Sequence, residues 1–145
     1  MINDTIKVTG ELKLTLTKPD GDKHETVIPN IVVTTGKAYI ASRMKDASAT
    51  AMSHMAIGTG TGSAAAGNTA LGTEAGRVAL TSTTVTSNAV AYVATFPAGT
   101  GTGAVTEAGI LNASSSGTLL CRTVFSVINK GAADTLGITW TVTVN

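Results

Sequence analysis

The sequence predicts an all-β fold, a jelly-roll-like antiparallel β-sandwich of about eight strands with one short helix. Residues 135–144 alternate apolar side chains with threonine, which is the period of a strand with one buried face. Residues 6–17 alternate in the same way, with Leu12, Leu14 and Leu16 on one side. We expect the 145 residues to form one sandwich domain, residues 1–145.

The first two strands are expected to form a hairpin around the turn at residues 19–22, with the second strand at about residues 23–33. Pro29 has no N–H to donate, so this second strand should lie at a sheet edge or break there. A short helix is expected over residues 37–45. Its N-cap would be Thr34 or Thr35, and lysine and arginine lie near its C-terminal end.

The remaining chain alternates loops and strands. Residues 46–76 are rich in small residues and are expected to form a long loop around a brief strand at residues 55–57. Four more strands are expected before the last one, at residues 77–86, 89–96, 104–111 and 118–127. A jelly roll and an immunoglobulin-like sandwich both fit these spacings.

Composition and charge exclude several classes of partner. Charged residues make up 13% of the chain, the formal net charge is +1 and the ten basic residues are scattered, so we expect no nucleic-acid partner. No segment approaches the ~20 apolar residues of a membrane span, and the start of the chain does not resemble a signal peptide, so we expect no membrane association. A single cysteine excludes an intrachain disulfide and favours folding in a reducing cytoplasm.

Motifs that suggest chemistry are incomplete. The glycines at residues 58–62 lack the spacing of a dinucleotide fingerprint, and Gly36-Lys37 lacks the other residues of a phosphate loop. His24 and His54 have no acidic or cysteine neighbour at ligand spacing. No nucleophile–base or paired-carboxylate arrangement can be proposed. We therefore predict no catalytic, cofactor or metal site, and we expect that the chain is not an enzyme.

Three single residues carry structural expectations. Cys121 lies in an apolar segment and is expected to behave as a small buried hydrophobe. Glu107 interrupts a segment of apolar and small residues, so it is expected to pair with Arg77 or Arg122 for structural reasons. Trp140 lies on the apolar face of the last strand.

Loops are the expected contact surfaces, because long loops in compact domains are usually functional or flexible. We favour the loop at residues 58–72, the turn at residues 99–103 and the N-terminal residues. The candidate contact residues are Gly58, Thr59, Gly60, Thr61 and Gly62 in the first site, and Gly99, Thr100, Gly101, Thr102 and Gly103 in the second.

Several segments resemble a recurrent pattern in the virion proteins of tailed bacteriophages. Residues 52–60 read Met-Ser-His-Met-Ala-Ile-Gly-Thr-Gly, and residues 107–112 read Glu-Ala-Gly-Ile-Leu-Asn. The resemblance covers the chain from about residue 33 to its end, and its other segments are residues 68–74, 94–99 and 122–125. Small phage proteins of this size and composition resemble capsid cement or decoration proteins, whose jelly-roll sandwiches bind outside the shell.

This resemblance implies a capsid cement protein on the outer surface of the phage capsid, made in the bacterial host cytoplasm. Its partners would be the major capsid protein and itself, as a homodimer or homotrimer, and it would clamp neighbouring capsid subunits against DNA pressure. The alternative is a tail fibre, knob or baseplate module involved in host attachment, where the Glu-Ala-Gly-Ile segment also occurs. Against a glycan-binding fibre, Trp140 faces the core and no repeats or heptads are visible.

Overall fold

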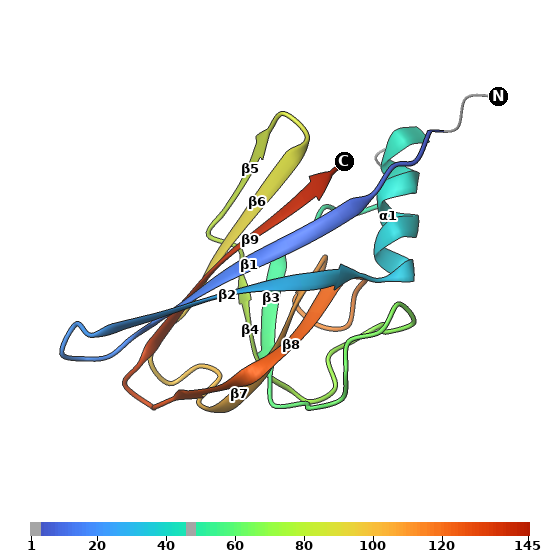
Figure 1. Cartoon of the computed structure of the whole chain (residues 1–145). Helices are drawn as coiled ribbons and strands as arrows, with labels where there is room; N and C mark the ends of the chain where they lie inside the picture. Colours follow the sequence, from blue (N-terminus) through green and yellow to red (C-terminus); the bar gives the residue numbers. More distant parts are fainter. Residues whose placement is uncertain (1–3, 46–48) are drawn as a thin grey trace.

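The computed structural model describes residues 4–45 and 49–145, and these form one curled antiparallel sheet with a single helix (Figure 1). Residues 1–3 of the expected N-terminal contact segment and residues 46–48 of the expected loop lie outside the described residues. The elements are β1 (Val8–Thr17), β2 (Lys23–Val32), α1 (Thr34–Lys45), β3 (His54–Gly58), β4 (Glu74–Ala79), β5 (Ser82–Thr86), β6 (Ala89–Phe96), β7 (Gly103–Leu111), β8 (Leu119–Lys130) and β9 (Thr135–Val144).

The sheet curls because its two ends are joined by two residues. The strand order is β4-β3-β7-β8-β2-β1-β9-β6-β5, so β4 and β5 lie at opposite ends, yet only Leu80 and Thr81 separate them. The three Cα–Cα steps from Ala79 to Ser82 span at most about 11 Å, which brings the two edges together. The Leu80 N–H donates to Ser53 O (2.9 Å) and the Thr81 N–H to Val93 O (2.7 Å), so the chain changes partner from β3 to β6 at this point.

This change of partner corrects one expectation. Residues 77–86 were expected to form a single strand, but they contain the break between β4 and β5, and the described residues therefore hold nine strands instead of eight. The expected class, an all-β antiparallel fold with one short helix, is confirmed, and β1 and β2 form the expected hairpin.

Strand β2 also connects two parts of the sheet. β2 pairs with β1 from Lys23 to Asn30, whereas only Ile31 and Val32 pair with β8. Pro29 lies next to this transition, so the expected break or edge at the proline is confirmed. Figure 1 shows β2 and β8 running apart from this point, with the β1–β2 hairpin extending away from the rest of the molecule.

The core lies between the two halves of the curled sheet. One half contributes the alternating side chains of β1 and β9, including Leu12, Leu14 and Trp140, each with 0% exposure. The other half contributes Ile57 and Cys121, also at 0% exposure. The buried positions expected for Trp140 and Cys121 are thus confirmed.

Helix α1 lies at one end of the molecule, near the start of β1 (Figure 1). It begins at Thr34, three residues earlier than expected, and the Lys37 N–H donates to Val33 O (3.0 Å). The Thr35 hydroxyl donates to Leu119 O on β8 (3.0 Å). Gly36 is buried, and a Cβ there would collide with the Leu120 carbonyl, so a glycine is needed for this close approach. Within residues 4–45 and 49–145, no helix is long and apolar enough to cross a membrane.

Candidate contact surface

The Glu107 carboxylate organises the longest loop of the described chain. It lies on β7 at 0% exposure, and its neighbour Ala108 belongs to the main core, so Glu107 points to the opposite, outer face of the sheet. Three backbone N–H groups donate to it, from Thr73 (2.7 Å), Gly72 (2.8 Å) and Gly60 (2.9 Å). These donors come from both ends of the segment at residues 59–73, which we call the covering loop.

Arg122 completes this network from the neighbouring strand β8. Its Nε and Nη2 donate to Glu107 Oε2 at 2.9 and 2.8 Å, and its side chain is only 3% exposed. The same guanidinium donates to Asn68 Oδ1 (2.9 Å) and to Gly62 O (3.0 Å) in the covering loop. Of the two expected partners of Glu107, the structure selects Arg122, whereas Arg77 pairs with Glu74 (2.6 Å).

The glycines at the start of the covering loop are required by the close approach of Glu107. A Cβ on Gly58 or Gly60 would lie 2.6 or 2.5 Å from Glu107 Oε1. The Thr106 hydroxyl also donates to Gly60 O (2.8 Å). The Gly-Thr-Gly motif at residues 58–60 is therefore a packing feature.

A small apolar cluster seals the loop against the outer face of the sheet. Leu71 is the loop's buried apolar residue, and the Thr34 N–H at the start of α1 donates to Ala66 O (2.8 Å). The strands β3, β7 and β8 are thus covered on both faces, by the main core and by the loop. The cluster consists of Val33, Ala56, Leu71, Leu111 and Leu119.

The hydrogen bonds keep Glu107 ionised despite its burial. Burial alone raises the pKa of Glu107, but the N–H groups of Thr73 and Gly72, the Arg122 side chain and the Gly60 N–H together lower it below its usual 4.5. A carboxylate has about four lone-pair sites and here accepts five hydrogen bonds. Its acceptor capacity is fully used, so it suits a structural role and not proton transfer to a substrate.

The outer surface of the covering loop is uncharged. Residues 59–73 contain no ionisable side chain, and Thr61, Gly62 and Ser63 are exposed. Among the described residues, no three His, Cys, Asp or Glu side chains are placed to hold a metal ion. The loop thus offers hydroxyls, small apolar groups and backbone on an ordered support, which is suited to contact with another protein.

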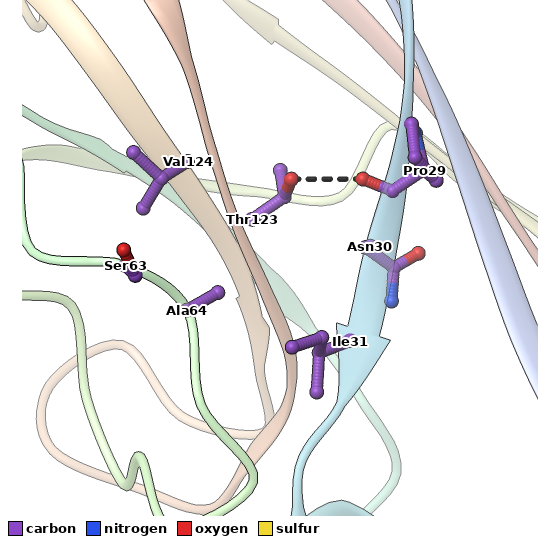
Figure 2. Close-up of a pocket in the computed structure, with 7 residues that line it drawn as sticks. All are labelled: Pro29, Asn30, Ile31, Ser63, Ala64, Thr123 and Val124. Carbon is purple, nitrogen blue, oxygen red and sulfur yellow. Dashed lines mark hydrogen bonds between the residues drawn. The ribbon is translucent and has the colours of Figure 1, made fainter.

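A groove lies beside the covering loop, where β2 and β8 separate. Figure 2 shows Ile31 of β2 and Ala64 of the loop facing each other across it, while the Thr123 hydroxyl donates to Pro29 O (2.9 Å) at its upper end. Its volume is about 330 Å³. None of its lining residues is ionisable: Pro29, Asn30, Ile31, Ser63, Ala64, Thr123 and Val124.

The second expected contact turn, residues 99–103, lies beside the point where β3 ends and β4 begins. The Gly99 N–H donates to Ala132 O (2.8 Å), and Gly99, Gly101 and Gly103 have positive φ values of 84°, 67° and 137°. A Cβ on Gly101 would collide with Ile57, so this glycine also allows close packing.

The ten candidate contact residues divide by burial. Gly58, Gly60 and Gly101 are buried and act in packing, whereas Thr61, Gly62, Gly99 and Thr102 are exposed. Thr59, Thr100 and Gly103 are partly buried. A contact role for the exposed residues stays a prediction.

Sequence reasoning did not predict that Glu107 bonds to the glycine-rich segment that begins the covering loop. It singled out Glu107 and the glycines separately, but not the bonds from Arg122 and Thr106 to the covering loop. The available signal was the placement of Arg122 inside the apolar run Leu-Leu-Cys-Arg-Thr-Val-Phe, because an arginine in a buried strand needs a buried partner.

Comparison with known proteins identifies the family. The family model for the N-terminal region of phage tail-collar fibre proteins matches residues 25–143. No curated protein and no solved structure matches the chain. The match runs from Glu25 in β2 to Thr143 in β9 and includes all residues of the Glu107 network.

The family match overturns the expected capsid cement function and the expected position on the outer capsid surface. The segments that carried the resemblance, residues 52–60, 68–74, 107–112 and 122–125, build β3, the covering loop and the Glu107–Arg122 pair. They therefore reflect the packing around Glu107, and they did not by themselves distinguish head from tail. The missing repeats and heptads are also no argument against a fibre, because an N-terminal domain does not itself need a stalk. The chain is a bacteriophage virion protein and belongs to the phage tail-collar fibre protein N-terminal family.

Proposed function

We propose that this domain is the attachment module of a phage tail fibre, and that it docks the fibre onto another protein of the tail through the covering loop. The observation that carries the proposal is that fifteen residues without regular secondary structure are held in place by a buried, ion-paired carboxylate. A buried charge pair is costly to desolvate and often contributes little to net stability. Its use here is consistent with fixing the shape of a loop.

An ordered loop binds a partner more tightly than a flexible one, because less conformational entropy is lost on binding. The neutral surface of the covering loop also avoids the desolvation of charged groups in an interface core. Both features favour a stable attachment contact over transient recognition.

The aromatic residues support attachment over glycan recognition. Trp140 and Phe96 are fully buried, Tyr92 is 8% exposed, and Tyr39 and Phe125 are partly buried. Glycan-binding faces usually present exposed aromatic rings, whose apolar faces pack against the sugar. The described surface offers no such ring.

Fibre occupancy on the virion tests this proposal. Thr61→Arg places a long charged side chain on the exposed loop, and Thr139→Arg makes the same change on an exposed position of β9. We expect both variants to fold with unchanged melting temperatures, but virions carrying Thr61→Arg to lose their fibres while virions carrying Thr139→Arg keep them. A full set of fibres on virions carrying Thr61→Arg, counted by electron microscopy, would refute the docking role of the loop.

A further inference from the structure

Two strand edges face the groove without ladder partners among the described residues. β2 pairs with β1 over Lys23–Asn30, but on its other side only Ile31 and Val32 pair with β8. Beyond Thr123, β8 pairs with β7 on one side and with no described strand on the other. The two edges diverge from the Ile31–Arg122 pair and form a fork, which is visible between β2 and β8 in Figure 1.

The backbone of β2 is oriented to bind in this fork. Pro29 O accepts a hydrogen bond from the Thr123 hydroxyl, so the backbone groups of residue 29 point toward β8. Backbone direction alternates along a strand, so the N–H and C=O groups of Val27 and Glu25 point the same way. Pro29 itself has no N–H, so no donor is lost at the position nearest the junction.

The groove at the junction of the fork is neutral and partly apolar, whereas the far end of the β2 edge carries Lys23, His24 and Glu25. The groove has no ionisable lining residue, and Ile31 within it is 39% exposed. Farther along the two strands, Val27 of β2 and Val127 of β8 are 58% and 54% exposed. Natural proteins usually protect free edges with charges or bulges, or by covering them. The 330 Å³ groove instead combines unpaired backbone with uncharged walls.

One buried donor beside the groove also lacks an acceptor. The Asn30 side chain accepts a hydrogen bond from Trp140 Nε1 (2.7 Å), but its own Nδ2 is buried and has no partner among the described residues. A buried donor without an acceptor is uncommon in native proteins and needs an explanation.

We propose that the fork accepts an extended, uncharged peptide segment of the tail protein to which the fibre attaches. This inference deepens the proposed function and rests on it. The segment would add as a strand: main-chain hydrogen bonds to β2 and β8 would supply affinity, and neutral small or β-branched side chains would fit the groove.

The presence of two free edges decides the kind of occupant. An edge strand of a folded second copy has only one free side, because its other side is bonded to its own sheet. A peptide segment that belongs to no sheet has two free sides, and it can pair with both β2 and β8. We therefore assign the groove to a flexible segment of the partner and not to a second copy of this chain.

A synthetic peptide tests the proposal on the full chain. The probe is fluorescently labelled acetyl-Thr-Val-Thr-Val-Thr-Val-amide, and the control is the same peptide with N-methyl groups on alternate residues, which removes main-chain donors. We expect saturable binding of the first peptide, and binding weaker by about tenfold or more for the N-methylated one, because main-chain hydrogen bonds are lost.

Two variants locate the site. Ala64→Arg fills the groove and introduces a charge, and Thr139→Arg is the matched control on β9. We expect Ala64→Arg to weaken peptide binding by about tenfold or more and Thr139→Arg to leave it unchanged. No saturable binding at millimolar peptide, equal binding of the N-methylated peptide, or unchanged binding by Ala64→Arg would each overturn the proposal.

Light scattering distinguishes the other occupant. A dimer of the unmodified chain that Ala64→Arg abolishes and that excess peptide does not dissociate would assign the groove to a second copy and overturn our proposal. The two proposals also fail separately. A negative peptide assay, with fibres lost from virions carrying Thr61→Arg, refutes strand addition alone. A positive peptide assay, with fibres retained on those virions, refutes docking through the covering loop.

Discussion

Glu107 acts only as an acceptor, and this property explains its environment. An ionised carboxylate accepts hydrogen bonds and donates none, and here it is surrounded by three backbone N–H groups and the guanidinium of Arg122. A neutral amide of the same shape would place an N–H donor among these donors. The position therefore requires both the charge and the acceptor chemistry of glutamate.

We expect Glu107→Gln to destabilise the domain by about 3–5 kcal/mol, because Arg122 would remain buried without a counter-charge. Urea denaturation would measure the loss in the free energy of unfolding. Glu74→Gln is the control: Glu74 also pairs with an arginine, but its side chain is 36% exposed, so its loss should cost at most about 1 kcal/mol. Equal effects of the two substitutions would show that the Glu107 network does not stabilise the fold.

The same carboxylate predicts a pH dependence. Because the pKa of Glu107 is lowered in the folded state, the unfolded chain binds more protons as the pH falls below 4.5, and the stabilisation is lost through this range. The stabilisation is fully present above that pH. Denaturation midpoints at pH 3 to 7 should fall more steeply on acidification for the unmodified chain than for Glu107→Gln, and parallel curves would contradict this assignment.

Part of this site could be predicted from single residues. A glutamate between small and apolar residues indicates a buried partner, and the sequence restricted that partner to Arg77 or Arg122. It could not choose between them, because both lie on strands of similar pattern and the choice depends on strand register. The bonds to Gly60 and Gly72 join residues 47 and 35 positions away from Glu107, and no local pattern reports them.

At the scale of elements, the covering loop contains two kinds of glycine, one packed against Glu107 and one in open space. A Cβ on Gly60 would lie 2.5 Å from Glu107 Oε1, whereas a Cβ on Gly62 would meet nothing within 4 Å. Neither glycine has a positive φ, so the two positions differ in space and not in backbone strain. They form a matched pair within one loop.

We expect Gly60→Ala to lower the free energy of unfolding by about 1–3 kcal/mol through overpacking. Gly62→Ala should be neutral or slightly stabilising, because alanine restricts the unfolded chain. Thermal unfolding monitored by circular dichroism checks both, and limited proteolysis should cut the covering loop faster only in Gly60→Ala. Equal melting temperatures for the two variants would argue against tight packing at Gly60.

Sequence patterns located several strands correctly but did not show where one strand ends and the next begins. Alternating residues located β1, β9 and β6 well, because one face of each strand is buried and the other is not. Residues 77–86 read as one strand, because the break at Leu80 and Thr81 changes the partner strand and not the extended backbone. Helix α1 began earlier than expected because Gly36, a poor helix former, is needed where the helix approaches β8.

At the scale of the whole molecule, the joined ends of the sheet predict cooperative unfolding. The β4–β5 connection joins the two edges of the sheet, and β2 joins its two halves. Neither half can therefore separate without breaking hydrogen bonds to strands of the other half. Single domains of this size usually unfold in one transition. We therefore expect the chain to unfold as one cooperative unit.

We therefore expect the fluorescence of Trp140, which reports the core, and far-ultraviolet circular dichroism, which reports the strands, to give coincident urea transitions. Trp140 is the chain's one tryptophan and is 0% exposed, so its signal has a single source. Separate midpoints would show that the two halves of the sheet unfold independently.

Composition explained the class of the protein better than its place in the virion. Low charge and abundant threonine fit a head protein and a tail protein equally. The segments shared with phage proteins maintain the fold around Glu107, so they carry no information about location. The family match supplied what these patterns could not.

The most direct test is a cryo-electron microscopy reconstruction of the intact tail at the base of the fibre. We expect this domain to lie at the attachment end, with Thr61 and Ser63 of the covering loop covered by another tail protein and Thr139 of β9 left exposed. A domain located at the free tip of the fibre, or one attached with its covering loop facing solvent, would contradict it.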